Sequence, residues 1–165
     1  MIPVFEQRLG ELVEILPLVV INETNFKVKY NWGTIDVLKE YLANNPNAYP
    51  LVWLVPTKTQ INVTQETTKA NATIAIATKS DKQHEFNGFI YDTDYRIILD
   101  VIENNLVRAL RNSSISNILD EYSSEKMPNY LVTLNEKQSP IDIWNATFLD
   151  IEIEFNNNCL RPIIF

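Results

Sequence analysis

The sequence predicts an α+β fold, in which amphipathic helices flank a mainly antiparallel sheet and a long β-hairpin projects from it. Three observations lead to this prediction. Apolar residues recur at helical spacing in 3–16, 34–44 and 94–111. Apolar and polar residues alternate strictly in much of 144–155, as in a strand with one buried face. Residues 59–78 are rich in Thr, Val, Ile and Ala and contain no Gly or Pro, which is typical of paired strands.

The chain begins with a predicted helix over 3–16. Pro3 suits the first turn of a helix, and Pro17 ends it because proline lacks a backbone N–H. Short strands are predicted over 18–21 and over 26–30, where apolar and polar residues alternate. The apolar side of the helix consists of Phe5, Leu9, Leu12, Val13 and Leu16.

A second helix is predicted over 34–44, with Thr34 as its N-cap. Residues 51–55 then form a continuous apolar run between Pro50 and Pro56. Such a run indicates a strand buried on both faces, so we expect it at the centre of the sheet.

The stretch 59–78 is predicted to be a long hairpin with its turn near 66–69. Two interpretations stay open: an arm that pairs with a neighbouring subunit, or an ordinary hairpin at the sheet edge. The second arm places four apolar residues on one face, namely Ala70, Ala72, Ile74 and Ile76.

The second half of the chain continues with a helix over 94–111, opened by Thr93 and Asp94. Residues 112–128 are polar with one apolar stripe, which predicts a short helix or an ordered loop. Strands are predicted over 130–134 and 144–155. In the last strand, one face carries Leu149, Ile151, Ile153 and Phe155, and the other carries Phe148, Asp150, Glu152 and Glu154.

Composition fits one domain over residues 1–165. The net charge of −7 argues against a protein that grips a phosphate backbone, because such binding relies on clustered Lys and Arg. Cys159 is the only cysteine, so no disulfide forms within the chain. We expect no secretory leader, and no apolar run is long enough to span a bilayer.

No local motif for catalysis or cofactor binding is found, so we expect no enzyme, no catalytic residue, no cofactor and no metal. His84 and Cys159 are each the only residue of their type and lack a flanking motif. The three glycines are isolated from one another, whereas phosphate-binding loops need them clustered.

Carboxylates are the remaining candidates for chemistry. Asp92 and Asp94 flank the predicted start of the third helix, where capping is their expected role. The acids of the last strand suit a solvated face or an acidic surface for a basic partner, with a divalent cation as the alternative. His84 with Glu85 could also ligate a metal, but a lone histidine in a polar loop normally does not.

The order of predicted elements resembles that of the tail terminator and neck-ring proteins of tailed bacteriophages, which are head-tail connector and tail completion proteins. Three stretches carry the resemblance. They are Tyr49-Pro-Leu-Val-Trp-Leu-Val-Pro, Gly88-Phe-Ile-Tyr-Asp-Thr-Asp-Tyr-Arg-Ile-Ile-Leu-Asp-Val-Ile and Trp144-Asn-Ala-Thr-Phe-Leu-Asp-Ile-Glu-Ile-Glu-Phe.

The resemblance implies a virion protein, made in the bacterial cytoplasm, that forms a ring at the head-tail neck or at the end of the tail tube. Its partners would be copies of itself, in a hexamer or dodecamer, and neighbouring portal, neck or tail-tube proteins. DNA would pass through the lumen without specific binding, and no membrane is involved. Strand addition by the hairpin would join the subunits. The expected interface residues are Ile61, Val63, Ala72, Ile74, Ile76 and Phe165.

Two other functions stay open. One is a small binding or regulatory domain, which would use the apolar C-terminal tail that ends at Phe165 as an anchor. The other is a metal-dependent hydrolase that would use Asp150, Glu152 or Asp92.

Overall fold

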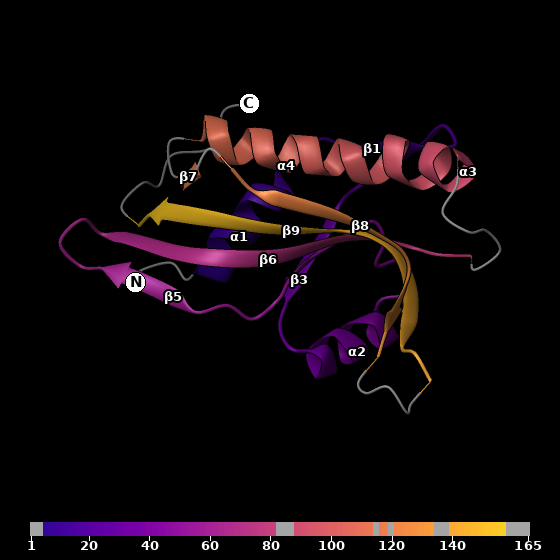
Figure 1. Ribbon diagram of the computed structural model, residues 1–165, viewed down its shortest axis with the longest axis horizontal. Coiled ribbons are helices and arrows are strands. Elements are labelled where there is room, and N and C mark those ends of the chain that lie inside the picture. Colours follow the sequence, from indigo (N-terminus) through magenta and orange to yellow (C-terminus); the bar gives the residue numbers. More distant parts are fainter. Residues whose placement is uncertain (1–4, 82–87, 114–115, 119–120, 134–138, 158–165) are drawn as a thin grey trace.

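A long antiparallel ladder between two strands forms the middle of the structure. The computed structural model describes residues 5–81, 88–113, 116–118, 121–133 and 139–157. Within it, β6 (Thr67–Lys79) pairs along its whole length with β9 (Asp142–Asn156), from Thr67 opposite Asn156 to Lys79 opposite Trp144. Figure 1 shows these two strands running side by side along the longest axis of the molecule.

Shorter strands extend this pair into a seven-stranded sheet of the described residues. The main strand order is β3 (Lys29–Trp32), β4 (Leu51–Leu54), β6, β9, β7 (Ser116–Ile118). Near the opposite ends of the ladder, β5 (Thr59–Asn62) pairs with β6, and β8 (Ser123–Val132) pairs with β9. Of the strand pairs in the described residues, only β3 with β4 is parallel. A separate ribbon consists of β1 (Val19–Ile21) and β2 (Thr24–Phe26).

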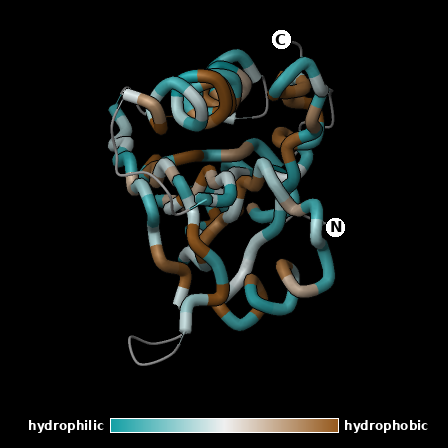
Figure 2. The backbone as a smooth tube through the Cα atoms, turned by 90° about the vertical axis from the view of Figure 1, so that its right-hand side faces the viewer, coloured by the Kyte–Doolittle hydropathy of each residue, from teal (hydrophilic) through white to brown (hydrophobic). Residues whose placement is uncertain are grey.

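Helices cover both faces of the sheet unequally. One face carries α1 (Phe5–Glu14) and a continuous helical segment composed of α3 (Gly88–Ile90), η1 (Tyr91–Leu99) and α4 (Asp100–Asn112). In the part of the chain that the structure describes, the other face carries only α2 (Ile35–Asn44). Figures 1 and 2 show α4 on one side of the sheet and α2 on the other.

Strand alternation explains why the core divides into two clusters. On β9, Leu149, Ile151, Ile153 and Phe155 point into the larger cluster under α1 and α4. Trp144 and Ala146, earlier in the strand and on its opposite side, belong to the smaller cluster under α2. Phe5 of α1 meets Phe155 edge to face, with the ring centroids 5.2 Å apart. The α+β class with a mostly antiparallel sheet, predicted from these patterns, is therefore confirmed.

The position predicted for β4 is wrong. Its four residues are buried on both faces, as expected, but β4 lies next to the edge strand β3. The centre belongs to β6 and β9, because each is long enough to pair with three strands: β6 with β4, β5 and β9, and β9 with β6, β7 and β8. A short apolar run indicates only that a strand is buried on two faces. Near the edge of the sheet, α2 covers one face of β4 and the larger core cluster covers the other.

The third helix also differs from its prediction. It begins at Gly88, before Thr93, and residues 91–99 are wound as a π-helix. The backbone N–H of Asp100 donates to the carbonyl oxygen of Tyr95, five residues earlier. This wider winding places Ile90, Tyr95 and Leu99 on the buried side at spacings of five and four. The side that faces the sheet therefore stays apolar through the change in winding.

Three further boundaries are corrected. Within 112–128, the described residues hold β7 and the start of β8 in place of a short helix. The strand predicted over 26–30 is divided between β2 and β3. The hairpin turns at 63–66, before the predicted position, and β5 pairs with only the first residues of β6. A long projecting hairpin stays a prediction.

Candidate functional site

The end of the β5–β6 hairpin carries the most exposed large apolar side chain in the described part of the chain. Val63, in the turn, is 83% exposed, and Ile61 of β5 is 60% exposed. Among the described residues, β5 pairs only with β6, so its outer edge faces no strand. An exposed strand edge with apolar side chains favours pairing with another chain.

Hydrogen bonds hold this hairpin end to the rest of the sheet. The backbone N–H of Gln65 donates to the side-chain oxygen of Asn62 at 3.0 Å, which closes the turn. Glu66 adopts a φ of 53°, and its carbonyl accepts the backbone N–H of Asn157 at 2.8 Å. The exposed residues are therefore presented by a structured turn.

The structure divides the predicted interface residues into three groups. Ile61 and Val63 are at the surface, as that role requires. Ala72, Ile74 and Ile76 are fully buried in the larger core cluster, and their assignment to an interface is wrong. They lie on the face of β6 that α1, η1 and α4 cover, so they stabilise this chain itself. Phe165 lies outside the described residues, as do His84, Glu85 and Cys159.

The acidic residues of β9 engage neighbours on the adjacent strand. Thr73 of β6 donates its hydroxyl hydrogen to Asp150 at 2.6 Å. Lys69 forms an ion pair with Glu152, and the hydrogen bond to this carboxylate raises the pKa of Lys69. In the described ranges, no group of three or more His, Cys, Asp and Glu residues is placed to hold a metal ion.

Asp92 and Asp94 lie inside the helical segment, so the capping role predicted for them is wrong. Asp92 pairs with Arg96 one turn later at 3.3 Å. Asp94 accepts a hydrogen bond from the amide of Asn145 on β9 at 2.5 Å. Because the helix begins at Gly88, the backbone N–H groups near these acids already belong to helical turns.

A polar cluster connects the π-helix to the sheet, and sequence patterns did not reveal it. Lys126 of β8 donates to Asp100 at 2.6 Å, and its ammonium lies 5.1 Å from the centre of the Tyr95 ring. The Tyr95 hydroxyl donates to the carbonyl oxygen of Ala146 at 3.0 Å. Burial raises the pKa of Tyr95. These contacts fix the orientation of the helix on the sheet.

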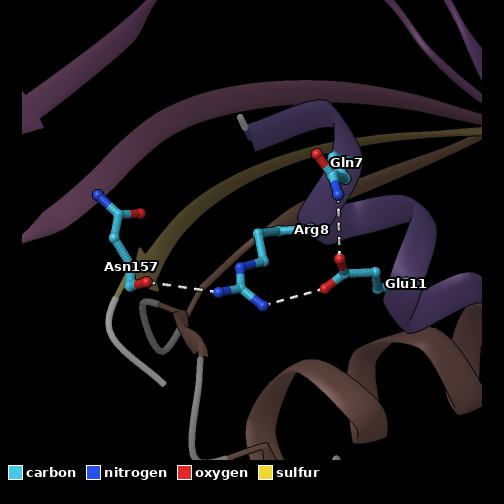
Figure 3. Close-up of polar contacts among 4 residues, drawn as sticks. All are labelled: Gln7, Arg8, Glu11 and Asn157. Atoms are coloured by element: carbon cyan, nitrogen blue, oxygen red, sulfur yellow. Dashed lines mark hydrogen bonds and ion pairs between the residues drawn. The ribbon is translucent and has the colours of Figure 1, made fainter. Parts of the chain in front are cut away.

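Arg8 is a buried cation on α1, with only 4% of its surface exposed. Its guanidinium donates to the carboxylate of Glu11 at 3.0 Å and to the backbone carbonyl of Asn157 at 3.4 Å, as Figure 3 shows. Its Nε–H has no acceptor among the residues that the structure describes. Helical periodicity assigned Arg8 to neither side of the helix, because it does not show that the end of β9 reaches this side of α1.

A third polar group lies on the α2 side of the sheet. The Tyr49 hydroxyl donates to Asp142 at 2.5 Å and accepts the indole N–H of Trp144 at 2.7 Å. Burial raises the pKa of Tyr49, and the hydrogen bond to Asp142 raises it further. The group ties the residues before β4 to the start of β9.

Comparison with protein-family models gives no match, and no curated protein matches the sequence significantly. In the described residues, no helix has the length and apolar character needed to cross a membrane.

Proposed function

We propose that this chain is a structural assembly protein that forms an oligomeric ring, similar to the tail terminator and neck-ring proteins of tailed bacteriophages. The observation that carries the proposal is the β5–β6 hairpin end, where Ile61 and Val63 are exposed beside a strand edge that is unpaired in the described structure. Strand addition at such an edge gives main-chain hydrogen bonds, and the apolar side chains add buried surface.

The position of this hairpin favours a head-to-tail contact. The hairpin lies at one end of the longest axis in Figure 1. If it binds a different surface of the next copy, the same contact can repeat from copy to copy in one direction. A heterologous contact of this kind generates a ring when the rotation closes. In this role the chain belongs to a virion neck or tail end, and it acts by assembly and not by catalysis.

The charge of the chain supports a lumen through which DNA passes without specific binding. A net charge of −7 repels a phosphate backbone unless basic residues are clustered. We expect purified protein to leave duplex DNA unretained at low salt in a gel-shift assay. Tight, salt-sensitive retention of DNA would contradict this part of the proposal.

The test of the ring is the mass of the protein at high concentration, by light scattering, with electron microscopy of the same sample. We expect closed rings for the wild type and a folded monomer for the double variant Ile61→Asp, Val63→Asp. Val20→Asp is the matched control, because Val20 is 58% exposed on the β1–β2 ribbon, away from the hairpin. Rings that persist in the double variant would contradict the role of the hairpin.

The second candidate is a small binding domain, and one specific observation favours it. An aromatic-lined pocket opens on the α2 side of the sheet. A wild-type protein that stays monomeric at high concentration would favour this candidate over the ring.

A further inference from the structure

The pocket between α2 and the sheet has a volume of about 150 Å³. We call it the α2 pocket. Its walls include the rings of Trp53, Trp144, Tyr130 and Phe148, together with Ala75 from the central strand β6 and Val55 just after β4. The pocket is thus built by β4, β6, β8, β9 and α2, which are distant in sequence.

The aromatic walls are held in place by their own contacts. Trp53 donates its indole N–H to the carbonyl oxygen of Gly33 at 3.1 Å, and Trp144 donates its own to the Tyr49 hydroxyl at 2.7 Å. The Tyr130 ring meets that of Phe148 edge to face at 5.0 Å and lies 6.4 Å from that of Trp144. Both indole N–H groups are therefore already used, and the rings contribute apolar surface.

The backbone beside the pocket is constrained at one glycine. Gly33, which also lines the pocket, has a φ of +138°, a conformation that residues with a side chain rarely adopt. A Cβ at this position would lie 3.0 Å from the side chain of Val37. The positive φ and the contact with Val37 therefore both require glycine at this position beside the pocket.

The size and the lining define the class of ligand. An apolar cavity of about 150 Å³ holds one benzene-sized group. Pockets of this kind bind through shape and apolar surface, with few polar contacts. Two sources could supply such a group: a free small molecule, or an aromatic or branched aliphatic side chain of a second copy of this chain.

We propose that the α2 pocket is a binding site for one small apolar ring or branched aliphatic group. The site goes beyond the ring proposal and does not depend on it, because every residue that forms it belongs to one chain. Only the second of the two sources requires assembly.

Benzene is the probe for the site. We expect a titration of the full-length protein with benzene to give saturable NMR shifts at the indole N–H groups of Trp53 and Trp144 and at the methyl group of Ala75. A wild-type protein that shows no saturable shift up to the solubility of benzene would overturn the proposal.

Two variants block the pocket by different routes. Ala75→Leu fills the pocket from the buried side of the sheet, and Val55→Phe narrows it from a position that is 37% exposed. Because Val55 is not a core residue, the second variant still tests the site if the first fails to fold. We expect each to weaken benzene binding by at least about tenfold, equivalent to about 1.4 kcal/mol. Thr73→Leu is the control, because Thr73 lies on the same face of β6 without lining the pocket. Equal binding by wild type and a folded blocked variant would overturn the proposal.

Light scattering of the same variants distinguishes the two sources. If a blocked variant loses both benzene binding and self-association, the apolar group that occupies the pocket comes from a second copy of the chain. If it loses benzene binding but associates as the wild type does, the apolar group that occupies the pocket belongs to a free small molecule. A monomeric wild type that binds benzene would count against the ring and leave the site intact.

Discussion

Thr68 and Asn157 exchange two hydrogen bonds at the end of the β6–β9 ladder. The Thr68 hydroxyl donates to the carboxamide oxygen of Asn157 at 3.1 Å and accepts from its nitrogen at 2.9 Å. Both residues are buried. Because the backbone N–H of Asn157 also donates to the carbonyl oxygen of Glu66, this pair anchors the hairpin turn to the end of β9.

We expect Thr68→Val to destabilise the protein by about 1–3 kcal/mol, because the substitution keeps the shape but leaves the Asn157 amide buried without its partner. Urea denaturation followed by circular dichroism measures the change. Thr67→Val is the control, since Thr67 is only half-buried. Equal stability of the two variants would show that the Thr68 pair contributes little.

Gly10→Ala should destabilise the protein although alanine is the better helix former. A Cβ on Gly10 would lie 2.8 Å from the Tyr30 ring, and that ring is held by a hydrogen bond from its hydroxyl to the carbonyl oxygen of Glu6 at 2.6 Å. Such overpacking typically costs about 1–3 kcal/mol.

Gly88→Ala is the control for Gly10→Ala, because its Cβ would meet nothing within 4 Å. We expect this variant to gain up to about 1 kcal/mol from the lower entropy of the unfolded chain. Thermal unfolding of the two proteins compares them directly. A Gly10→Ala protein as stable as Gly88→Ala would mean that Tyr30 moves away at little cost.

Arg8→Met should change stability little, or increase it. Methionine fills similar space, and the substitution removes a buried Nε–H that has no acceptor in the described structure. Its ion-pair partner Glu11 is 45% exposed and remains hydrated. Replacement of buried charges by apolar residues is often neutral or stabilising by about 1–4 kcal/mol. A loss above about 2 kcal/mol in urea denaturation would show that the contact with Asn157 dominates.

Stability should decrease in alkali. Burial raises the pKa values of Tyr30, Tyr49 and Tyr95 above the usual 10.0 of tyrosine. The folded state therefore holds these protons at pH values where the unfolded state has lost them, and stability falls as the pH rises above about 10. Urea midpoints measured from pH 8 upward, with tyrosinate absorbance, follow the effect. A midpoint that is constant as the unfolded tyrosines ionise would contradict it.

Several elements could be predicted because their signal is local. The stripe from Phe5 to Leu12 predicts α1, and the alternation from Leu149 to Phe155 predicts both the strand and its buried face. The π-helix could not be predicted, because Tyr95, Ile98, Leu99 and Ile102 recur at spacings that also fit an α-helix. The burial of Ala72, Ile74 and Ile76 under this chain's own helices could not be predicted either, since alternation shows that a face is covered but not by what.

The sequence by itself determined the α+β class, the approximate position of most elements and the residues that face away from water, because these depend on periodicity and on local breakers such as Pro17. The tertiary structure decided which strands are central, which acids pair with which neighbours and where the α2 pocket forms. These features depend on contacts between residues that are far apart in the sequence, such as Tyr49 with Asp142 and Thr68 with Asn157. Such contacts follow from strand order and register, which no short stretch of sequence encodes.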